Sequence, residues 1–179
     1  PDVKVDFVNC RNVDNFLVAD FNVLDNFTRL SSVTLNLAQE GAQAFRPRNG
    51  VIKNGHVQNG HFGYGLVQVQ VGYHILFKDL SGVGGVTLRL ESGAVAFAPP
   101  EINIDQIYAR NISVTNGHGA LMLGPHTRTN GHVDADGVTA VSAVTAASAG
   151  LGFATADEAA AGLTPGRFAP TCIIRNVHA

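Results

Sequence analysis

Two side chains of opposite charge stand close together in the stretch GGVTLRLESG, residues 84–93. Arg89 and Glu91 are two positions apart, so in a β-strand they would lie on the same face. A glutamic acid whose pKa is raised by a partly apolar setting can act as a general acid, and a neighbouring arginine can orient it or hold an anionic group. The spacing also fits an exposed ion pair worth about 0–1 kcal/mol, which is the alternative interpretation.

The residues around this pair predict which faces the strands expose. Apolar and polar residues alternate in GLVQVQV (65–71), GVTLRLE (85–91) and GALMLG (119–124). A period of two in short segments is typical of β-strands, and helical periodicity is nearly absent. If the aliphatic side chains point inward, one outward row would hold Gln70, Arg89 and Met122, with Glu91 and His126 close beside it. We therefore expect a catalytic site on an exposed sheet.

A short pattern of an apolar residue, any residue and then Asn or Asp recurs along the chain. It occurs at Asn9, Asn54, Asp79, Asn111, Asp136 and Asn176. Short strands repeated at about 25 residues predict a right-handed parallel β-helix, an all-β solenoid in which stacked coils share one core. A β-sandwich is the alternative, but hairpin dipeptides do not recur with the pattern. The Asn and Asp side chains are expected to cap bends or to form a ladder inside the helix.

Length and composition indicate one folded domain over residues 1–179. The chain is 45% hydrophobic and 15% charged, and its formal net charge of -2 predicts neither a nucleic acid nor a membrane as a partner. The longer gaps in the repeat predict insertion loops at about 94–101 and 143–170. Because the chain opens on Pro1 without a methionine, we expect a truncated or processed part of a longer protein.

Three blocks between Asn54 and Asn130 resemble the core motifs of a known family, the iota-carrageenases: GYGLVQVQ, GGVTLRLE and NGHGALMLGPH. The resemblance implies a secreted glycoside hydrolase of a marine bacterium, with a right-handed parallel β-helix, that cleaves internal β-1,4 linkages of sulfated iota-carrageenan with inversion. It also implies roles for individual residues: Glu91 as general acid, His126 as an active-site histidine, Arg89 and Tyr64 as cleft residues, and Gln68 as a ligand of a chloride ion. Gln70 would contact substrate beside Arg89.

One position departs from the family. Gly93 stands where the family typically carries the aspartate that activates water, and two carboxylates spaced i and i+2 would lie about 6.5–7 Å apart, as an inverting enzyme needs. Glu101, Asp105 or His126 could replace that base, or the protein could bind without cutting efficiently. Two other functions stay open: a pectin-type lyase or hydrolase on the same fold, and a non-catalytic carbohydrate-binding β-helix.

The sequence also leads to predictions about bound ions and partners. No cofactor is required and no metal is expected among the site residues, but Asn103–Asp105 and Asp134–Asp136 offer clustered oxygens for a structural Ca²⁺ or Na⁺. The histidines show no zinc-binding spacing. The expected partner is a sulfated polysaccharide, and the expected assembly is a monomer.

Overall fold

The computed structural model describes residues 8–11, 13–23, 35–38, 47–58, 65–69, 72–90, 104–123, 132–143, 145–149 and 171–179, and every element in them is a strand. The strands form two six-stranded parallel sheets. Sheet A contains β1 (Val8–Arg11), β3 (Leu35–Ala38), β5 (Gly65–Val69), β7 (Val86–Leu90), β9 (Gly119–Leu123) and β11 (Thr145–Ala149). Sheet B contains β2 (Asp14–Val23), β4 (Arg48–Val57), β6 (Gly72–Val83), β8 (Ile104–Thr115), β10 (His132–Val141) and β12 (Thr171–His178).

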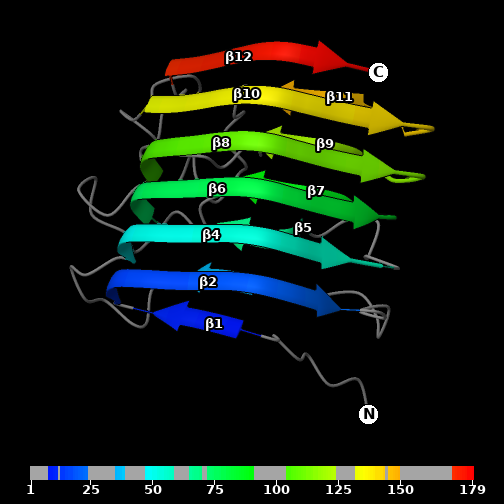
Figure 1. Cartoon of the computed structure of the whole chain (residues 1–179). Coiled ribbons are helices and arrows are strands. Elements are labelled where there is room, and N and C mark those ends of the chain that lie inside the picture. Colours follow the sequence, from blue (N-terminus) through cyan, green and yellow to red (C-terminus); the bar gives the residue numbers. More distant parts are fainter. Residues whose placement is uncertain are drawn as a thin grey trace, which may run out of the picture.

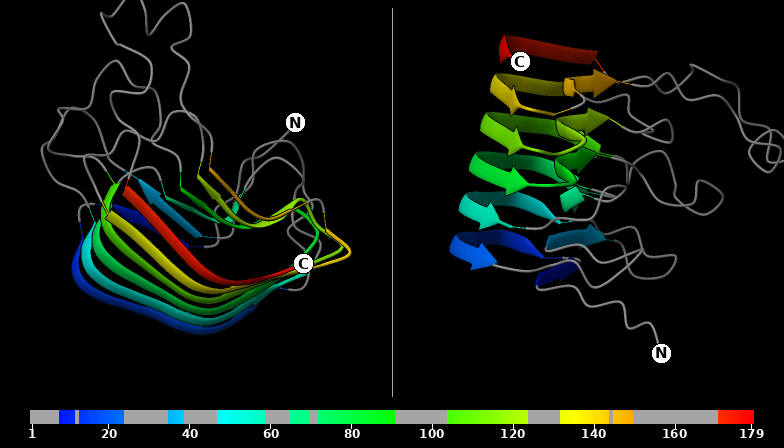
Figure 2. Two further views of the ribbon diagram at one scale, coloured as in Figure 1. Left: turned by 90° about the horizontal axis from the view of Figure 1, so that it is seen from above. Right: turned by 90° about the vertical axis from the view of Figure 1, so that its right-hand side faces the viewer.

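The chain alternates between the two sheets, so each coil contributes one strand to each. Figure 1 shows sheet B in front with its strands running to the right, sheet A returning behind it, and a rise of one strand per coil, which is a right-handed turn. Figure 2 shows sheet B curving around one side of the stack, with sheet A on the opposite side. Because all the pairings are parallel, the predicted right-handed parallel β-helix is confirmed and the sandwich, which is antiparallel, is excluded.

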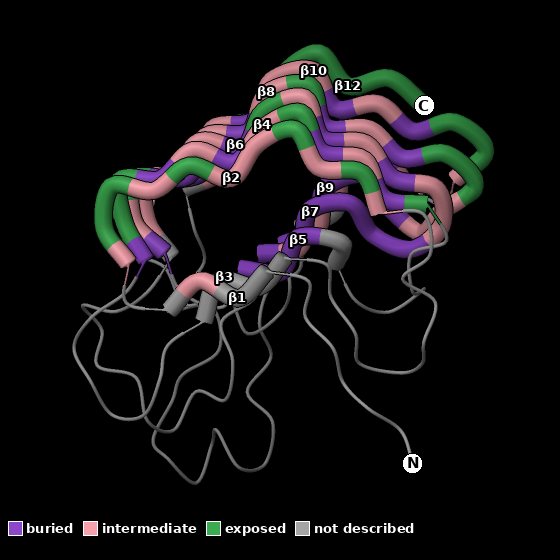
Figure 3. Tube along the Cα trace, turned by 60° about the horizontal axis from the view of Figure 1, so that its bottom comes forward, coloured by how far each residue is buried: buried purple, intermediate pink, exposed green. Residues whose placement is uncertain are grey.

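The core lies between the two sheets and is built from stacked aliphatic side chains. In sheet A, Val67, Leu88 and Leu121 occupy one register position on adjacent strands and are at most 2% exposed. From sheet B, Phe77 and Ile75 are among the largest fully buried side chains. Figure 3 shows buried residues recurring at matching positions from coil to coil. No single coil encloses its inner face, so stability depends on stacking neighbours.

The strands of sheet B are longer than predicted because they bend without ending. At one register position they carry residues with φ between 51° and 73°, namely Asp20, Asn54, Asp79, Asn111, Gly137 and Asn176. Asn, Asp and Gly are the residues that tolerate this left-handed conformation. The bend adds one outward residue, so buried positions stand three apart there, as in Phe77 and Leu80. A second column with φ between 51° and 55° contains Asn15, Asn49, His74 and Gln106.

The recurring Asn/Asp pattern was therefore predicted correctly at four of its six positions and wrongly at two. The first member of the column is Asp20, whereas Asn9 lies in β1 of sheet A and pairs with Asn36. The fifth is Gly137, one residue after Asp136. The side chains do form a ladder, through bonds such as Asn54 Nδ2 to Asp20 Oδ1 at 2.8 Å. The prediction that the ladder lies inside the helix is wrong, because these bends point to the exposed side.

The predicted insertion loops are only partly covered by the described residues. Residues 145–149, inside the predicted loop 143–170, form β11 and pair with β9, so this part belongs to a regular coil. The predicted loop 94–101 and residues 151–170 lie outside the described residues. Cys10 and Cys172 are free thiols, on β1 and β12. In the part of the chain that is described, no helix is long and apolar enough to cross a membrane.

Candidate active site on the outer face of sheet A

Strand register places Arg89 between Gln68 and Met122 on the outer face of sheet A. Gln68 on β5 pairs with Arg89 on β7, which pairs with Met122 on β9. The predicted row began with Gln70, and this is wrong: a slip of two residues keeps the same face but changes the partner. The neighbouring residues Leu88 and Leu90 point into the core and are fully buried, so Arg89 points outward.

Gln68 is the feature of this row that stands out chemically. The residue is 7% exposed, yet its Oε1 has no hydrogen-bond partner among the described residues. Buried polar atoms almost always have a partner, so an unsatisfied one indicates a place for a bound group. The amide offers N–H donors as well as an acceptor, and the Arg89 guanidinium belongs to the next strand. The unsatisfied Oε1 is an acceptor and would need a donor such as water, whereas the amide N–H groups and the Arg89 guanidinium are the donors that would suit the chloride expected at Gln68.

Thr87 shows how β7 is held against sheet B. It alternates with the inward residues Val86 and Leu88, yet it is only 1% exposed. Its Oγ1 donates a hydrogen bond of 2.7 Å to the backbone carbonyl of Ser113 on β8. This bond ties the strand that carries Arg89 to the coil that follows it.

The other predicted site residues, Glu91, His126, Gln70 and Tyr64, lie outside the described residues, as does Glu101. The described strands nevertheless constrain the topology. Leu90 and Leu123, the last residues of β7 and β9, are register partners. The carboxyl ends of β7 and β9, which precede Glu91 and His126 in the sequence, are therefore adjacent.

Asp105, one candidate for the missing base, belongs to the other sheet. It lies near the start of β8 and its Oδ1 accepts a hydrogen bond of 3.0 Å from the backbone N–H of His132 on β10. This bond joins two adjacent strands of sheet B and supports a structural role for Asp105. Asp105 is therefore a weaker candidate for the water-activating group than His126 or Glu101.

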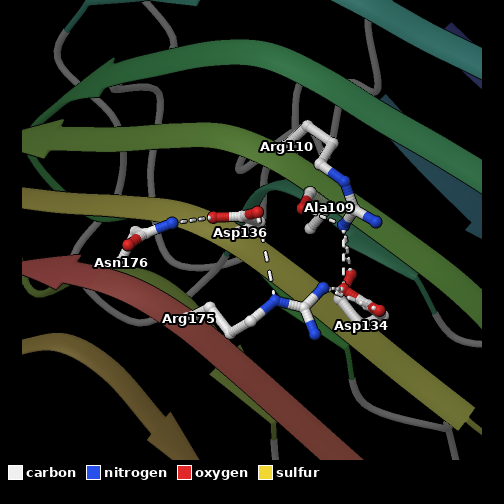
Figure 4. A network of polar contacts seen from close by, with 6 residues as sticks. All are labelled: Ala109, Arg110, Asp134, Asp136, Arg175 and Asn176. Atoms are coloured by element: carbon white, nitrogen blue, oxygen red, sulfur yellow. Dashed lines mark hydrogen bonds and ion pairs between the residues drawn. The ribbon is translucent and has the colours of Figure 1, made fainter.

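A polar network on sheet B was missed at the sequence level (Figure 4). Asp134 Oδ1 lies 3.1 Å from Arg110 Nη1 and 2.7 Å from Arg175 Nη2. Asp136 Oδ1 accepts a hydrogen bond of 2.6 Å from Asn176 Nδ2. The strand register places Arg110 and Arg175 on either side of Asp136, and both side chains reach diagonally to Asp134.

This network bears on the predicted cation site. The carboxylates of Asp134 and Asp136, which were proposed as Ca²⁺ or Na⁺ ligands, are engaged by protein donors, and this does not support a cation site at Asp134–Asp136.

The two arginines also set the ionisation of Asp134. Burial raises the pKa of this carboxyl, but the hydrogen bond from Arg175 and the charges of Arg110 and Arg175 outweigh burial, so the pKa lies below its ordinary value. Among the residues with described positions, no group of three or more His, Cys, Asp or Glu side chains could hold a metal ion.

The chain was compared with protein-family profiles and with known proteins. No protein-family profile matches the chain. The chain is 37% identical over 143 residues to an iota-carrageenase of Zobellia galactanivorans and 33% identical over 143 residues to an iota-carrageenase of Alteromonas macleodii. Each alignment covers 79% of this chain and 29% of the relative, so the chain spans less than a third of the length of these relatives.

Solved structures agree with the sequence relatives. A 1,3-α-1,4-β-D-galactose-4-sulfate-3,6-anhydro-D-galactose-2-sulfate 4-galactohydrolase superposes with a TM-score of 0.74 at 31% identity, over 82% of this chain and 34% of the neighbour. A family GH82 iota-carrageenase from A. fortis, solved in the absence of chloride ions, gives a TM-score of 0.73 at 32% identity, over 82% and 31%. An iota-carrageenase complexed to iota-carrageenan fragments gives 0.69 at 29% identity, over 83% and 34%. The part of the chain that these comparisons cover belongs to the iota-carrageenase family.

Proposed function

We propose that the protein is an endo-acting glycoside hydrolase that cleaves the β-1,4 linkages of iota-carrageenan with inversion. The observation that carries this proposal is the pairing of Gln68 with Arg89 on the outer face of sheet A, two positions before Glu91, in a chain related to iota-carrageenases. The name of one solved relative specifies galactose 4-sulfate and anhydrogalactose 2-sulfate. A substrate of that kind carries a sulfate on each sugar, which a cationic groove would bind.

In this proposal Glu91 protonates the oxygen of the leaving sugar. An inverting hydrolase needs one protonated carboxyl group for this step and a base on the opposite side of the ring to activate water. Arg89 would hold a sulfate of the substrate or orient Glu91, because a guanidinium binds oxyanions through two parallel hydrogen bonds. Tyr64 and Gln70 are proposed as further substrate contacts.

The base is the open part of the mechanism, since Gly93 supplies no carboxylate. We propose His126, which follows β9 in the sequence as Glu91 follows β7, because the carboxyl ends of these two strands are adjacent. A neutral imidazole can take a proton from water near neutral pH. Glu101 is the alternative, and the bond from His132 makes Asp105 the weaker choice.

The setting of the proposed reaction follows from its substrate. A long polysaccharide is met outside the cell, so we propose secretion by a marine bacterium that degrades algal carrageenan. The enzyme would act as a monomer, with no cofactor in the chemical step and a chloride ion beside Gln68 and Arg89.

Reducing-end release from iota-, kappa- and lambda-carrageenan and from polygalacturonate tests the proposal directly. Wild type should cleave iota-carrageenan selectively, and Glu91→Gln should lose at least about 10²-fold in kcat, the usual contribution of a general acid. His126→Gln and Glu101→Gln, assayed in parallel, identify the base: the variant of the true base loses activity that added azide or formate partly restores. Cleavage of polygalacturonate instead would support a pectin-type enzyme and overturn the proposal.

One observation favours a second function, a non-catalytic carbohydrate-binding β-helix. Gly93 removes the carboxylate that an inverting site would be expected to use. If wild type binds iota-carrageenan but releases no reducing ends, and neither Gly93→Asp nor added nucleophile creates activity, binding is the function.

A further inference from the structure

A row of cations runs across the outer face of sheet B, away from the site on sheet A. Lys53 on β4 pairs with Lys78 on β6, which pairs with Arg110 on β8. Each of them follows a fully buried residue, so all three side chains point outward. Adjacent strands are about 4.8 Å apart. We call these three residues the basic row.

The two lysines of the basic row are the cations that a ligand could engage. Lys53 has no ionic partner among the described residues, and Lys78 Nζ lies 3.7 Å from Asp79 in a pair whose side chains are 50% and 40% exposed. Such an exposed pair is worth about 1 kcal/mol or less and is easily exchanged. Arg110 is held by Asp134 at 3.1 Å, and Asp136 is its register partner on β10, so the row ends there.

An apolar row lies directly beside the cations, two residues earlier on each strand. It consists of Val51, Leu76 and Tyr108, which are register partners and partly exposed. Tyr108 meets the ring of His74 edge to face, with ring centroids 6.2 Å apart. An aromatic ring with a polar end, next to aliphatic side chains, suits the apolar face of a sugar.

We propose that this face of sheet B is a second, non-catalytic binding surface for a sulfated polysaccharide chain. The chain would run across the strands, with sulfates on the basic row and sugar rings over Leu76 and Tyr108. The strand spacing is close to the length of one sugar residue, so a polymer with a sulfate on each sugar presents charges at the spacing of the cations. The choice of iota-carrageenan as the ligand rests on the proposed function, whereas the surface itself rests on the register of sheet B.

The test is retention on immobilised iota-carrageenan, measured in the Glu91→Gln background so that the polymer is not consumed. The variants are Lys53→Gln/Lys78→Gln, the charge-conserving Lys53→Arg/Lys78→Arg, and Tyr108→Ala beside Tyr108→Phe. Arg48→Gln is the control for charge, with losses compared per charge removed, because Arg48 is an exposed cation of the same sheet that already pairs with Asp14 at 2.9 Å. Hydrolysis of a short oligosaccharide by each variant with Glu91 restored reports on the other site.

We expect the Lys→Gln pair and Tyr108→Ala to weaken retention several-fold and to make it less sensitive to salt, with oligosaccharide hydrolysis unchanged. The Lys→Arg pair, Tyr108→Phe and Arg48→Gln should bind as the parent does. Equal losses for Arg48→Gln and the lysine variants would show a general charge effect and overturn the proposal. So would binding of wild type to phosphatidylserine vesicles but not to iota-carrageenan. Absence of hydrolysis with intact, lysine-dependent retention would instead contradict only the proposed enzymatic function.

Discussion

Asn111 donates a hydrogen bond of 2.8 Å from Nδ2 to Oδ1 of Asp79, a residue 32 positions earlier in the sequence. Both residues have a φ of 54°, and they occupy the same register position on β8 and β6. The bond recurs between Asn54 and Asp20. The column therefore does two things at once, since it bends each strand and joins the bends of neighbouring coils.

Replacing Asn111 separates these two contributions. Asn111→Ala should lower the free energy of unfolding by about 2 kcal/mol, roughly half from the left-handed backbone and half from the lost hydrogen bond. Asn111→Gly keeps the backbone conformation accessible, so it should cost clearly less than alanine. Urea denaturation measures both, with Thr115→Ala as an exposed control on the same strand. Equal destabilisation by alanine and glycine would contradict a role for the backbone conformation.

Size complementarity between β2 and β4 gives a second test. Phe21 pairs with Gly55, and a Cβ atom on Gly55 would overlap the Phe21 ring. Gly55→Ala should therefore cost about 1–3 kcal/mol of stability, as overpacking usually does. The smaller Phe21→Leu should recover part of that loss in the double variant, so the two changes should be non-additive in thermal or urea unfolding. Additive effects would show that the two positions do not share one space.

The fold could be predicted from the sequence because each coil shows the alternation of apolar and polar residues, and the spacing between coils shows the repeat length. Leu88 and Leu90 are inward and Arg89 is outward, as the period of two predicted. The strand register could not be predicted from the sequence. Shifting β5 by two residues exchanges Gln70 for Gln68 beside Arg89, and it moves no side chain to the other face, so the apolar pattern fits both registers.

The alternation of apolar and polar residues also failed to predict the bends of sheet B. An outward left-handed residue lets Phe77 and Leu80 face inward at a spacing of three, which interrupts alternation without ending the strand. Glycine occupies this conformation as readily as asparagine, so Gly137 took the position that the pattern gave to Asp136. The network of Asp134 with Arg110 and Arg175 depends on the same register and was missed for that reason.

The lowered pKa of Asp134 predicts how the free energy of unfolding depends on pH. Its pKa is lowered in the folded protein, so its stabilising contribution is present above the unfolded pKa of about 3.9 and is lost as pH falls through the folded value. Asp134→Asn should lower stability by about 1 kcal/mol at neutral pH and flatten the acid side of the stability curve. Thermal unfolding between about pH 7 and pH 2 measures both effects.

Asp14→Asn provides the comparison for this experiment. The hydrogen bond from Asn49 lowers the pKa of Asp14, as do the bond and charge of Arg48, against the opposing effect of burial. The direction of the shift is the same, but Asp14 is more exposed than Asp134, at 37% against 16% of the side chain. Its variant should therefore change the acid limb less. A larger change for Asp14 would contradict the role assigned to the Arg110–Asp134–Arg175 network.

The ion proposed beside Gln68 can be tested without measuring activity. A ligand that binds only the folded state raises the melting temperature with its concentration. Replacing sodium acetate by sodium chloride at constant ionic strength should therefore stabilise wild type. The gain should disappear in Gln68→Leu, which fills a similar volume without the N–H donors that an anion needs. Because Gln68 is buried and its Oε1 has no partner within the described strands, Gln68→Leu should cost little stability in acetate. Equal stabilisation of wild type and Gln68→Leu by chloride would place the ion elsewhere or nowhere on this face.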